Sequence, residues 1–473
     1  MKTITHFACC LMTAITIVSA CTPDDDTDYS DSSDSKKTES SLFATFDNEE
    51  YFVDAEGGKL TMTFKSNLGE DDELRVAYQK LDWVSFDSPS ETRAKTWKGE
   101  ISIYVEPNTT KERRQAMFAL VKMKGDDTWE ELDTATVTQY GIASGYESTD
   151  YSHDGEVAQL QTHSVGHGIP VVLMGDGFTD IDIADSTYWT VMATAADNIF
   201  SEEPAMSMRH YFDIYIVNAV SENDAVGEDY KTAFSSVPEL SSSYIEADAD
   251  KITTYAEKVN RKDSLNMLVV VVLNSNVQNG VTYLYSLRNK PSQYAVALCP
   301  ITGGLESEDF REVLVHEAIG HGLAKLADEY GYEENGEADE AARREIKELQ
   351  EYNWLLNVDT TANVAKVKWW AFVDNDKFAN EDISAYEGGD TYVKGLWRPT
   401  INSMMNQNDC PFNAPSRKAI YDRIRYLGEN ARTSTMDEFT LFDMAHKPQQ
   451  WSYTTRASHT AKRRLARPRI IRK

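Results

Sequence analysis

The hydrophobic pattern of this 473-residue chain changes near residue 150, and this change constrains the fold more than any other feature. Before it, apolar and polar residues alternate in short runs such as 59–64 and 101–105, with turn residues between the runs. After it, continuous apolar runs such as 169–174 and 268–273 alternate with segments of helical spacing. The first pattern predicts a β-sandwich and the second an α/β layered domain. We therefore expect a multidomain protein.

Composition sets the expected boundaries within this scheme. Residues 22–43 are Asp, Ser, Thr and Lys with almost no apolar side chain, so they cannot form a core. The expected parts are a signal peptide at 1–20, an acidic tether at 21–43, a β-sandwich module at 44–140, a linker at 141–156, an α/β domain at 157–450 and a basic tail at 451–473.

The N-terminus predicts export. A positive residue, Lys2, precedes a short apolar stretch, Phe7–Ala20, which is too short for a membrane span. Small residues before Cys21 resemble the lipobox of bacterial lipoproteins, which implies acylation of Cys21 and membrane attachment through that lipid only. The acidic run 24–26 resembles the export tag of surface lipoproteins in some Gram-negative anaerobes, which implies an outer-membrane, surface-exposed protein. An ordinary signal peptide followed by a solvated linker is the alternative.

Charge and cysteine content exclude several classes. The chain has 47 Lys+Arg against 77 Asp+Glu, a net charge of −30, which argues against nucleic acid and anionic lipid surfaces as partners. The segment 456–473 is basic throughout and is expected to be a solvated tail or an arm packed on the acidic body. Only Cys299 and Cys410 remain in the folded part, so one disulfide is possible but no disulfide framework is.

The strongest chemical signal is His316-Glu317-Ala318-Ile319-Gly320-His321. It lies in a segment, 307–330, that is expected to be one helix capped by Ser307. Two histidines and a glutamate on one helix are how zinc peptidases present their metal. We expect His316 and His321 to bind Zn²⁺ and Glu317 to take a proton from metal-bound water.

The spacing of the two histidines requires a distorted helix. They are five residues apart, and five residues turn an α-helix by about 500°, which would send the second side chain some 140° away from the first. Both reach one metal only if a residue is looped out, as in a π-bulge. Gly320 and Gly322 flank His321 and would permit such a distortion.

Further motifs resemble known peptidases. The expanded spacing is similar to that of the dipeptidyl-peptidase III family. More of the chain resembles the IgA-specific metallopeptidase family, which implies a zincin-type, metzincin-like catalytic domain acting on polypeptide or glycoprotein. The stretches that carry this resemblance are Met174–Phe178, Val315–Glu317 through Leu326–Tyr330, Tyr386–Gly389, and Trp397–Pro399 through Ser403–Met405.

The third metal ligand is open at this point. Asp328 lies seven residues beyond His321, about 10 Å along an unbroken helix, so it reaches the metal only if the helix breaks after Leu323. The metzincin-like clan places a ligand soon after the helix in that way, so Asp328 is our choice. The rivals are Glu329, Glu387 and the glutamates of 338–351.

Several other residues have two interpretations. Ser403-Met404-Met405 resembles the methionine turn beneath the metal of metzincins, or it is an ordinary core pair. The run Tyr294–Leu298 is a strand either at the edge, where it would pair with a peptide, or inside the sheet. Asp176 follows a strand and binds a cation or forms a tight turn. The candidates to stabilise the oxyanion are Tyr330, Tyr386 and Tyr421.

The N-terminal module also resembles a known domain. Trp83, residues 107–110, Arg113-Arg114 and residues 137–139 occur in an order similar to the small immunoglobulin-like domain of Bacteroidetes surface proteins. That resemblance implies a glycan-binding β-sandwich, and a spacer is the alternative.

Three functions follow from these features. The leading one is a surface-anchored zinc endopeptidase. The alternatives are a non-catalytic glycan- or protein-binding lipoprotein with a degenerate metal site, and a purely structural zinc site.

Overall fold

The computed structural model describes residues 15–18, 43–447 and 465–472, apart from short gaps at 54, 56, 69–73, 80, 87–96, 111–112, 126–127, 140, 142–144, 240–242, 262–265 and 288–289. The predicted lipidation site, Cys21, lies outside the described residues. The chain divides into two compact units, Met1–Ile142 and Ala143–Lys473, which we describe separately. The prediction of a multidomain chain joining a β unit to an α/β unit is confirmed.

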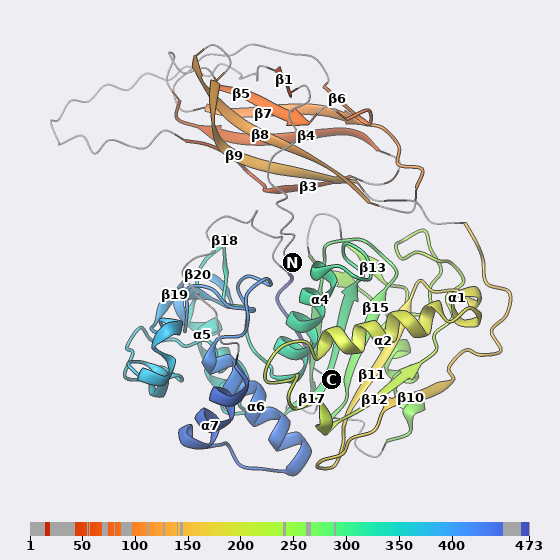
Figure 1. Ribbon diagram of the computed structural model, residues 1–473, viewed down its shortest axis with the longest axis vertical. Coiled ribbons are helices and arrows are strands. Elements are labelled where there is room, and N and C mark those ends of the chain that lie inside the picture. The colour runs from red at the N-terminus through yellow and green to blue at the C-terminus, as the bar shows by residue number, and fades with distance from the viewer. Residues whose placement is uncertain are drawn as a thin grey trace, which may run out of the picture. The chain divides into compact units, whose positions relative to one another are not determined.

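The first unit consists of two sheets that share one apolar core (Figure 1). Side chains alternate between the two faces of a strand, so Met62 and Phe64 in β4 are buried while Thr61 and Thr63 are exposed. The sheet orders are β1-β5-β8-β9-β3 and β2-β4-β7-β6. The strands are β1 (Ile15–Val18), β2 (Ala44–Phe46), β3 (Glu50–Val53), β4 (Gly58–Ser66), β5 (Leu74–Gln79), β6 (Val84–Phe86), β7 (Trp97–Val105), β8 (Arg114–Gly125) and β9 (Thr128–Gln139).

One strand lies where the sequence predicts a signal peptide outside the fold. The strand β1 pairs antiparallel with β5. Its Ile-Thr-Ile-Val sequence favours an extended strand, and without it β5 would be a sheet edge. This part of the apolar stretch is therefore paired with the fold, and its removal as a signal peptide stays a prediction.

The second unit is built on a seven-stranded sheet with order β10-β12-β11-β15-β17-β16-β21 (Figure 1). Val171 and Leu173 in β11 join the core on the face covered by α2 and α4, while Val172 and Met174 join the core beneath α3. Both faces are thus buried, which explains the continuous apolar runs. The elements are β10 (Val157–Gln161), β11 (Ile169–Asp176), α1 (Asp180–Ala184), α2 (Thr187–Ile199), β12 (Phe212–Val217), α3 (Ala249–Ala256), β15 (Leu268–Leu273), β16 (Val281–Leu287), β17 (Lys290–Pro300), α4 (Glu308–Leu314) and β21 (Arg469–Arg472).

The structure decides between the two interpretations of Tyr294–Leu298. The run is an internal strand and not an edge, because β17 lies between β15 and β16. Residues 148–154, which lie in the predicted linker, make hydrogen bonds within the second unit. The Ser148 N–H donates to the Glu222 carbonyl (2.8 Å), and the Asp154 carboxylate accepts from the Tyr255 hydroxyl (2.6 Å).

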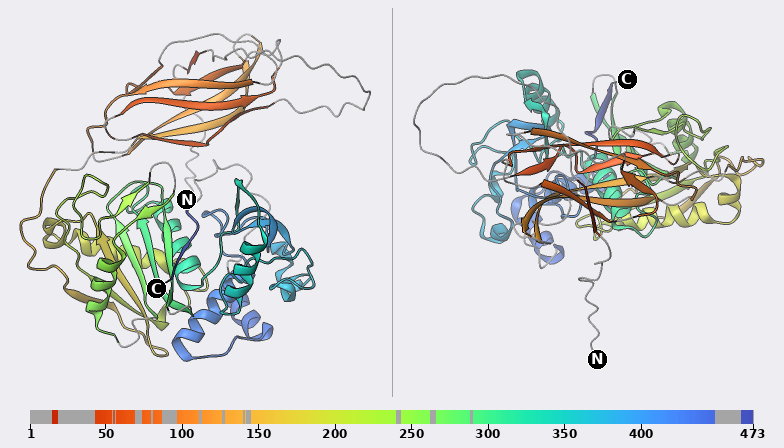
Figure 2. Two further views of the ribbon diagram at one scale, coloured as in Figure 1. Left: turned by 180° about the vertical axis from the view of Figure 1, so that it is seen from behind. Right: turned by 90° about the horizontal axis from the view of Figure 1, so that it is seen from above.

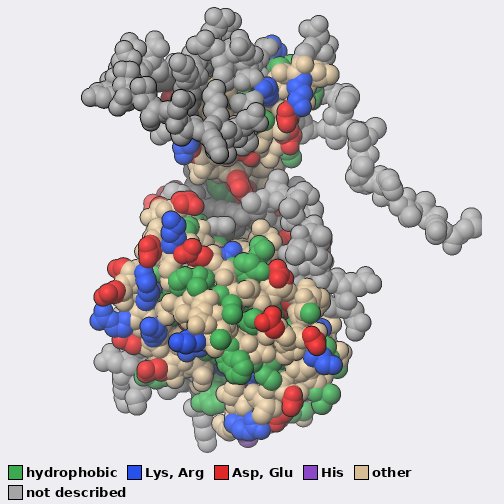
Figure 3. Space-filling model, turned by 90° about the vertical axis from the view of Figure 1, so that its left-hand side faces the viewer, with side chains coloured by type: hydrophobic (Ala, Val, Ile, Leu, Met, Phe, Trp, Pro, Cys, Tyr) green, Lys and Arg blue, Asp and Glu red, His purple; other side chains and the backbone are tan. Residues whose placement is uncertain are grey.

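Smaller elements complete the second unit. A three-stranded sheet has the strand order β18-β20-β19. The face of the molecule that Figure 3 shows carries acidic and basic side chains that are interspersed. Cys299 and Cys410 are buried thiols that form no disulfide. No helix among the described residues is long and apolar enough to cross a membrane. The remaining elements are β13 (Val237–Pro238), β14 (Ile245–Glu246), β18 (Gly331–Glu337), α5 (Glu340–Gln350), β19 (Tyr386–Gly389), β20 (Thr391–Arg398), α6 (Ala414–Glu429) and α7 (Met436–His446).

A buried ion network anchors α6. The Arg417 guanidinium lies 2.7 Å from Glu381 Oε1 and 2.7 Å from Asp443 Oδ1, and all three side chains are almost fully buried. We expect Arg417→Met to lower the free energy of unfolding by about 3–5 kcal/mol, because two buried carboxylates lose their cation. Urea unfolding followed by tryptophan fluorescence measures the change.

The matched control is an exposed arginine of the same unit. Arg432 pairs with Glu438 at 3.0 Å, but its side chain is 68% exposed. Arg432→Ala should change the free energy of unfolding by no more than about 1 kcal/mol. Equal effects of the two substitutions would contradict the anchoring role of Arg417.

Candidate metal centre

The predicted distortion of the metal-bearing helix is present. Ser307 caps α4 by accepting a hydrogen bond from the Asp309 N–H, and α4 continues as a π-helix over Val315–Leu323. A π-helix bonds residues five apart, so it places His316 and His321 on one face. Their Nε2 atoms are 3.0 Å apart. The predicted π-bulge is therefore confirmed.

The two glycines near His321 serve close packing. A Cβ placed on Gly320 would lie 2.4 Å from Met405 Sδ, and one on Gly322 would lie 2.6 Å from Leu268 Cδ1. Neither glycine has a positive φ. Their role is therefore to let the sheet and the methionine approach the helix, and not to supply the unusual backbone freedom that the sequence suggested.

Hydrogen bonds fix the tautomer of both imidazoles. His316 Nδ1 lies 3.0 Å from the Met404 carbonyl oxygen, and His321 Nδ1 lies 2.8 Å from the Leu326 carbonyl oxygen. A carbonyl only accepts, so each Nδ1 carries the proton and donates it. Each Nε2 then presents a lone pair, which is the form in which histidine binds a metal.

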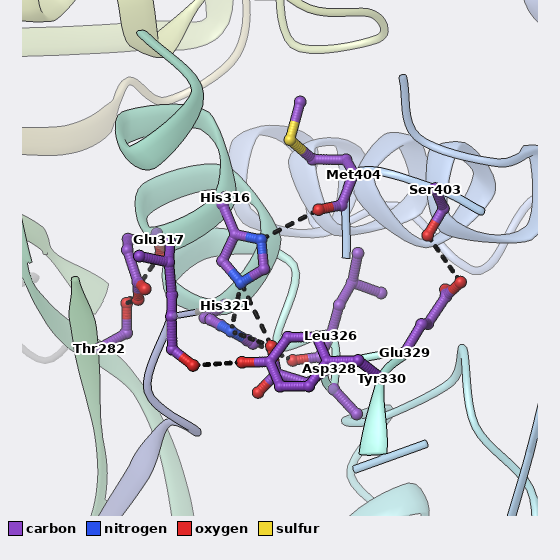
Figure 4. Close-up of polar contacts among 12 residues, drawn as sticks. Thr282, His316, Glu317, His321, Leu326, Asp328, Glu329, Tyr330, Ser403 and Met404 are labelled. Atoms are coloured by element: carbon purple, nitrogen blue, oxygen red, sulfur yellow. Dashed lines mark hydrogen bonds and ion pairs between the residues drawn. The ribbon is translucent and has the colours of Figure 1, made fainter. Parts of the chain in front are cut away.

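The helix ends early and returns Asp328 to the histidines. It was expected to reach Tyr330, but it stops at Leu323, and Lys325 adopts a left-handed conformation with φ of 58°. Asp328 Oδ1 consequently lies 3.3 Å from His316 Nε2 and 3.4 Å from His321 Nε2 (Figure 4). The ligand atoms of these three buried residues all lie within 4.8 Å of one another.

The charges at this site fit a cation. Two imidazole lone pairs and a carboxylate converge in a fully buried space, an arrangement that repels itself unless a positive charge lies among them. Neither carboxylate oxygen of Asp328 has a hydrogen-bond partner among the described residues. The donor set therefore suits a divalent metal ion.

The rival ligands point elsewhere. Glu329 is buried and accepts hydrogen bonds from Ser403 (2.6 Å), Asn357 (2.9 Å) and Asn413 (3.0 Å), so it ties the loop to α6. Burial raises the pKa of Glu329. Glu387 is exposed and accepts from the Gly395 N–H. The glutamates of 338–351 lie on or beside α5, away from this cluster.

Glu317 lies buried beside the histidines. The Thr282 hydroxyl is 2.6 Å from Glu317 Oε2, whereas Oε1 has no hydrogen-bond partner among the described residues. Burial raises the pKa of Glu317 to about 8. A carboxyl group with this pKa both accepts and releases a proton near neutral pH.

Of the three candidate tyrosines, only Tyr330 is at the site. It is fully buried near Glu317 and Asp328, and burial raises its pKa well above the usual range. The Tyr386 hydroxyl instead bonds Asp382, and the Tyr421 ring packs against Phe439.

The methionine pair lies beneath the histidines. The Met404 carbonyl binds His316, and the Met405 carbonyl accepts from the Glu329 N–H. Both methionine side chains are fully buried. The segment thus supports the metal site through its backbone carbonyls.

Asp176 is a structural carboxylate. It is buried and accepts hydrogen bonds from the Thr232 hydroxyl (3.0 Å) and from the N–H groups of Phe234 and Ser236 (both 3.0 Å). These bonds hold a long loop against β11. Of the two interpretations, the turn rather than the cation site fits this environment.

Sequence reasoning missed Thr282, Asn357 and Asn413. Each donates to a carboxylate of the site, Asn413 to both oxygens of Glu329, but none lies in a recognisable motif. For Thr282, the sequence showed only that the residue lies in a mostly apolar run. That pattern predicts a strand but does not indicate which of its residues contacts the site.

Comparisons with solved structures give only weak likenesses. The chaperone–tip adhesion subunit pre-assembly complex CsuC–CsuE of Acinetobacter baumannii is 11% identical, with 24% of this chain and 63% of that chain covered and a TM-score of 0.17. WR4, a C. elegans MSP family member, is 13% identical, with 21% and 97% covered and a TM-score of 0.17. A Bacteroides ovatus GH5 xyloglucanase is 14% identical, with 49% and 45% covered and a TM-score of 0.19. These scores carry no argument about fold or function.

The family comparison is more informative. No curated protein matches the chain. Residues 157–378, however, match the family model described as IgA Peptidase M64. The matched segment contains Glu317 and the cluster of His316, His321 and Asp328. Residues 157–378 are therefore identified as an IgA peptidase M64 segment, and the protein is a metallopeptidase.

Proposed function

We propose that the protein is a zinc-dependent endopeptidase that hydrolyses peptide bonds in protein or glycoprotein substrates. The observation that carries the proposal is the convergence of two imidazoles of fixed tautomer and one carboxylate beside Glu317. His316, His321 and Asp328 would hold the ion, and a set of nitrogen and carboxylate ligands that leaves one position open suits catalytic zinc. Bound zinc polarises a carbonyl group and lowers the pKa of water.

Glu317 serves as general base and then as general acid. Thr282 holds one carboxylate oxygen, which leaves Oε1 to take the proton of the attacking water and deliver it to the leaving amine. The buried Tyr330 hydroxyl donates a hydrogen bond to the developing oxyanion.

We also propose the finer architecture. The two-sheet first unit is an immunoglobulin-like sandwich, and the second is a zincin-type catalytic domain, with its metal helix packed on the sheet. Glycan binding by the first unit is a proposal too. Within that unit, the Trp83 ring already contacts a side chain, because the Arg114 guanidinium lies 4.5 Å from the centre of the ring.

The cellular location is proposed from the N-terminal sequence. Acylation of Cys21 would attach the protein to the outer membrane, and the acidic tether would present it at the cell surface. Membrane contact would then involve the lipid alone. Metabolic labelling with an alkyne fatty acid tests this, because Cys21→Ala should lose the label.

The first test of the peptidase is metal content. We expect about one zinc per chain by elemental analysis, because a catalytic site of this kind holds one ion. The His316→Ala/His321→Ala double variant should contain none. Chelation should abolish hydrolysis of a casein or peptide-library substrate by the parent chain, and added zinc should restore it. A parent chain that binds no zinc after reconstitution would refute the proposal and favour the non-catalytic binding protein.

A further inference from the structure

The last described segment of the chain runs past the metal centre. Leu465 and Ala466 are almost fully buried, at 1% and 4% exposure, and they join the two cores on opposite faces of the sheet. Figure 2 shows the C-terminal strand, in dark blue, between the green sheet and the blue helical part of the second unit. The described part of the basic segment, residues 465–472, is therefore packed on the second unit.

The peptide bond between Leu465 and Ala466 lies against the proposed catalytic groups. The Leu465 carbonyl accepts a hydrogen bond from the Tyr330 hydroxyl. The Ala466 N–H donates to the Gly280 carbonyl at 3.1 Å. A Cβ on Gly280 would lie 3.0 Å from Glu317 Oε1, so this backbone passes directly beside the proposed general base.

The following residues cover the sheet edge. β21 pairs in parallel with β16, with Tyr283 opposite Arg469 and Ser286 opposite Arg472. Without β21, β16 would be the outermost strand. The exposed edge of a sheet is where extended polypeptides bind, through backbone hydrogen bonds. The tail thus occupies the edge of β16 that an extended polypeptide would need for its backbone hydrogen bonds.

Charge fixes the position of the tail. Arg467 Nη2 lies 2.7 Å from Asp390 Oδ2, and the Asp390 side chain is only 2% exposed whereas that of Arg467 is 31% exposed. Asp390 is attached to the metal loop, because its N–H donates to the Asp328 carbonyl at 2.7 Å. A buried carboxylate beside a backbone-binding edge selects a cationic side chain.

We propose that residues 465–472 occupy the substrate groove of this enzyme as an intramolecular competitor. The groove runs from Tyr330 and Gly280 along β16. Because Asp390 binds the basic residue, the groove selects an extended polypeptide whose basic residue follows an aliphatic residue by two positions, as Arg467 follows Leu465. The tail must leave before such a polypeptide binds. This inference rests on the proposed peptidase function, because it assigns the substrate groove of that site.

The test measures binding and needs no turnover. The probe is a fluorescein-labelled peptide with the sequence of residues 462–473, added to full-length chains and followed by fluorescence anisotropy. Arg467→Ala removes the guanidinium of the tail, and Ala466→Pro removes the N–H that binds Gly280. Each should make the probe bind roughly tenfold more tightly, because each removes one hydrogen bond that holds the tail in the groove.

Three controls make the result specific. A scrambled probe of the same composition should bind none of the chains at the same concentration. Arg432→Ala removes a surface cation elsewhere and should bind the probe as the parent does. Adding Asp390→Asn to Arg467→Ala should reverse the gain roughly tenfold, because the cation of the probe loses its carboxylate. Thermal melts verify that each chain is folded.

The outcomes separate this inference from the peptidase proposal. Folded Arg467→Ala and Ala466→Pro chains that bind the probe no better than the parent would overturn the inference, whether or not zinc and hydrolysis are found. Probe binding with the expected pattern in a chain that holds no zinc and cleaves nothing would keep the groove and refute the peptidase. With both intact, the same two variants should hydrolyse an Arg-containing fluorogenic peptide roughly tenfold faster at limiting substrate.

Discussion

Replacing Glu317 by glutamine is expected to lower kcat/KM by roughly 10²–10⁴-fold, the usual contribution of a general acid–base group. Glutamine has nearly the shape of glutamate, but it takes up no proton from water and delivers none to the leaving amine. The Thr282 hydroxyl still has an oxygen to bond, so the side chain should keep its position. Steady-state kinetics on a fluorogenic peptide and elemental analysis for zinc measure the two consequences.

This prediction is informative because it separates the effect on zinc content from the effect on catalytic activity. Glu317 is not in the cluster of ligand atoms, so Glu317→Gln should keep the zinc content of the parent chain. Glu387→Gln is the matched control, because Glu387 is an exposed glutamate in Tyr386–Gly389, one of the stretches that resemble the peptidase family. It should retain both zinc and activity. A zinc-loaded Glu317→Gln chain with parental kcat/KM would show that another group moves the proton.

The metal-bearing helix was predictable because its signals are local. A cap at Ser307 and the spacing of His316 and His321 act within one helix, so the sequence indicated both the cap and the π-bulge. The end of that helix was not predictable. It depends on the left-handed Lys325 and on the bond from the Glu329 N–H to the Met405 carbonyl, which joins distant parts of the chain.

The order of the strands in the sheet also could not be predicted from the sequence. The apolar run in β17 correctly predicted a strand, but an apolar run is the same for an edge as for an inner position. The strand is internal because β16 pairs with it and β21 then pairs with β16. A basic C-terminal segment has the composition of a solvated tail, and only its contacts with Asp390 and Tyr330 reveal where it lies.

Supporting groups were the least predictable part of the site. Thr282, Asn357 and Asn413 are common polar residues, and their importance arises from the carboxylates that the fold places next to them. The same holds for the choice between Asp328 and Glu329. Both follow the helix directly, and only the loop geometry turns one toward the histidines and the other toward Ser403.

The choice between these two neighbours leads to the second large effect. We expect Asp328→Asn to weaken zinc binding by more than the roughly 10–100-fold that loss of an outer-shell hydrogen bond costs. The reason is that the substitution removes the negative charge from the ligand set, whose other members are neutral imidazoles. Competition with a chromophoric zinc chelator measures the affinity, and hydrolysis should fall in proportion to the zinc lost.

Glu329→Gln provides the control, because it is the same chemical change one residue away. Glu329 accepts from Ser403, Asn357 and Asn413, and a glutamine keeps one acceptor oxygen for these donors. Its effect on zinc affinity should therefore stay within the roughly 10–100-fold range of an outer-shell change. If Glu329→Gln instead abolishes zinc binding while Asp328→Asn retains it, then the loop turns Glu329 inward when the metal binds, and the third ligand is Glu329.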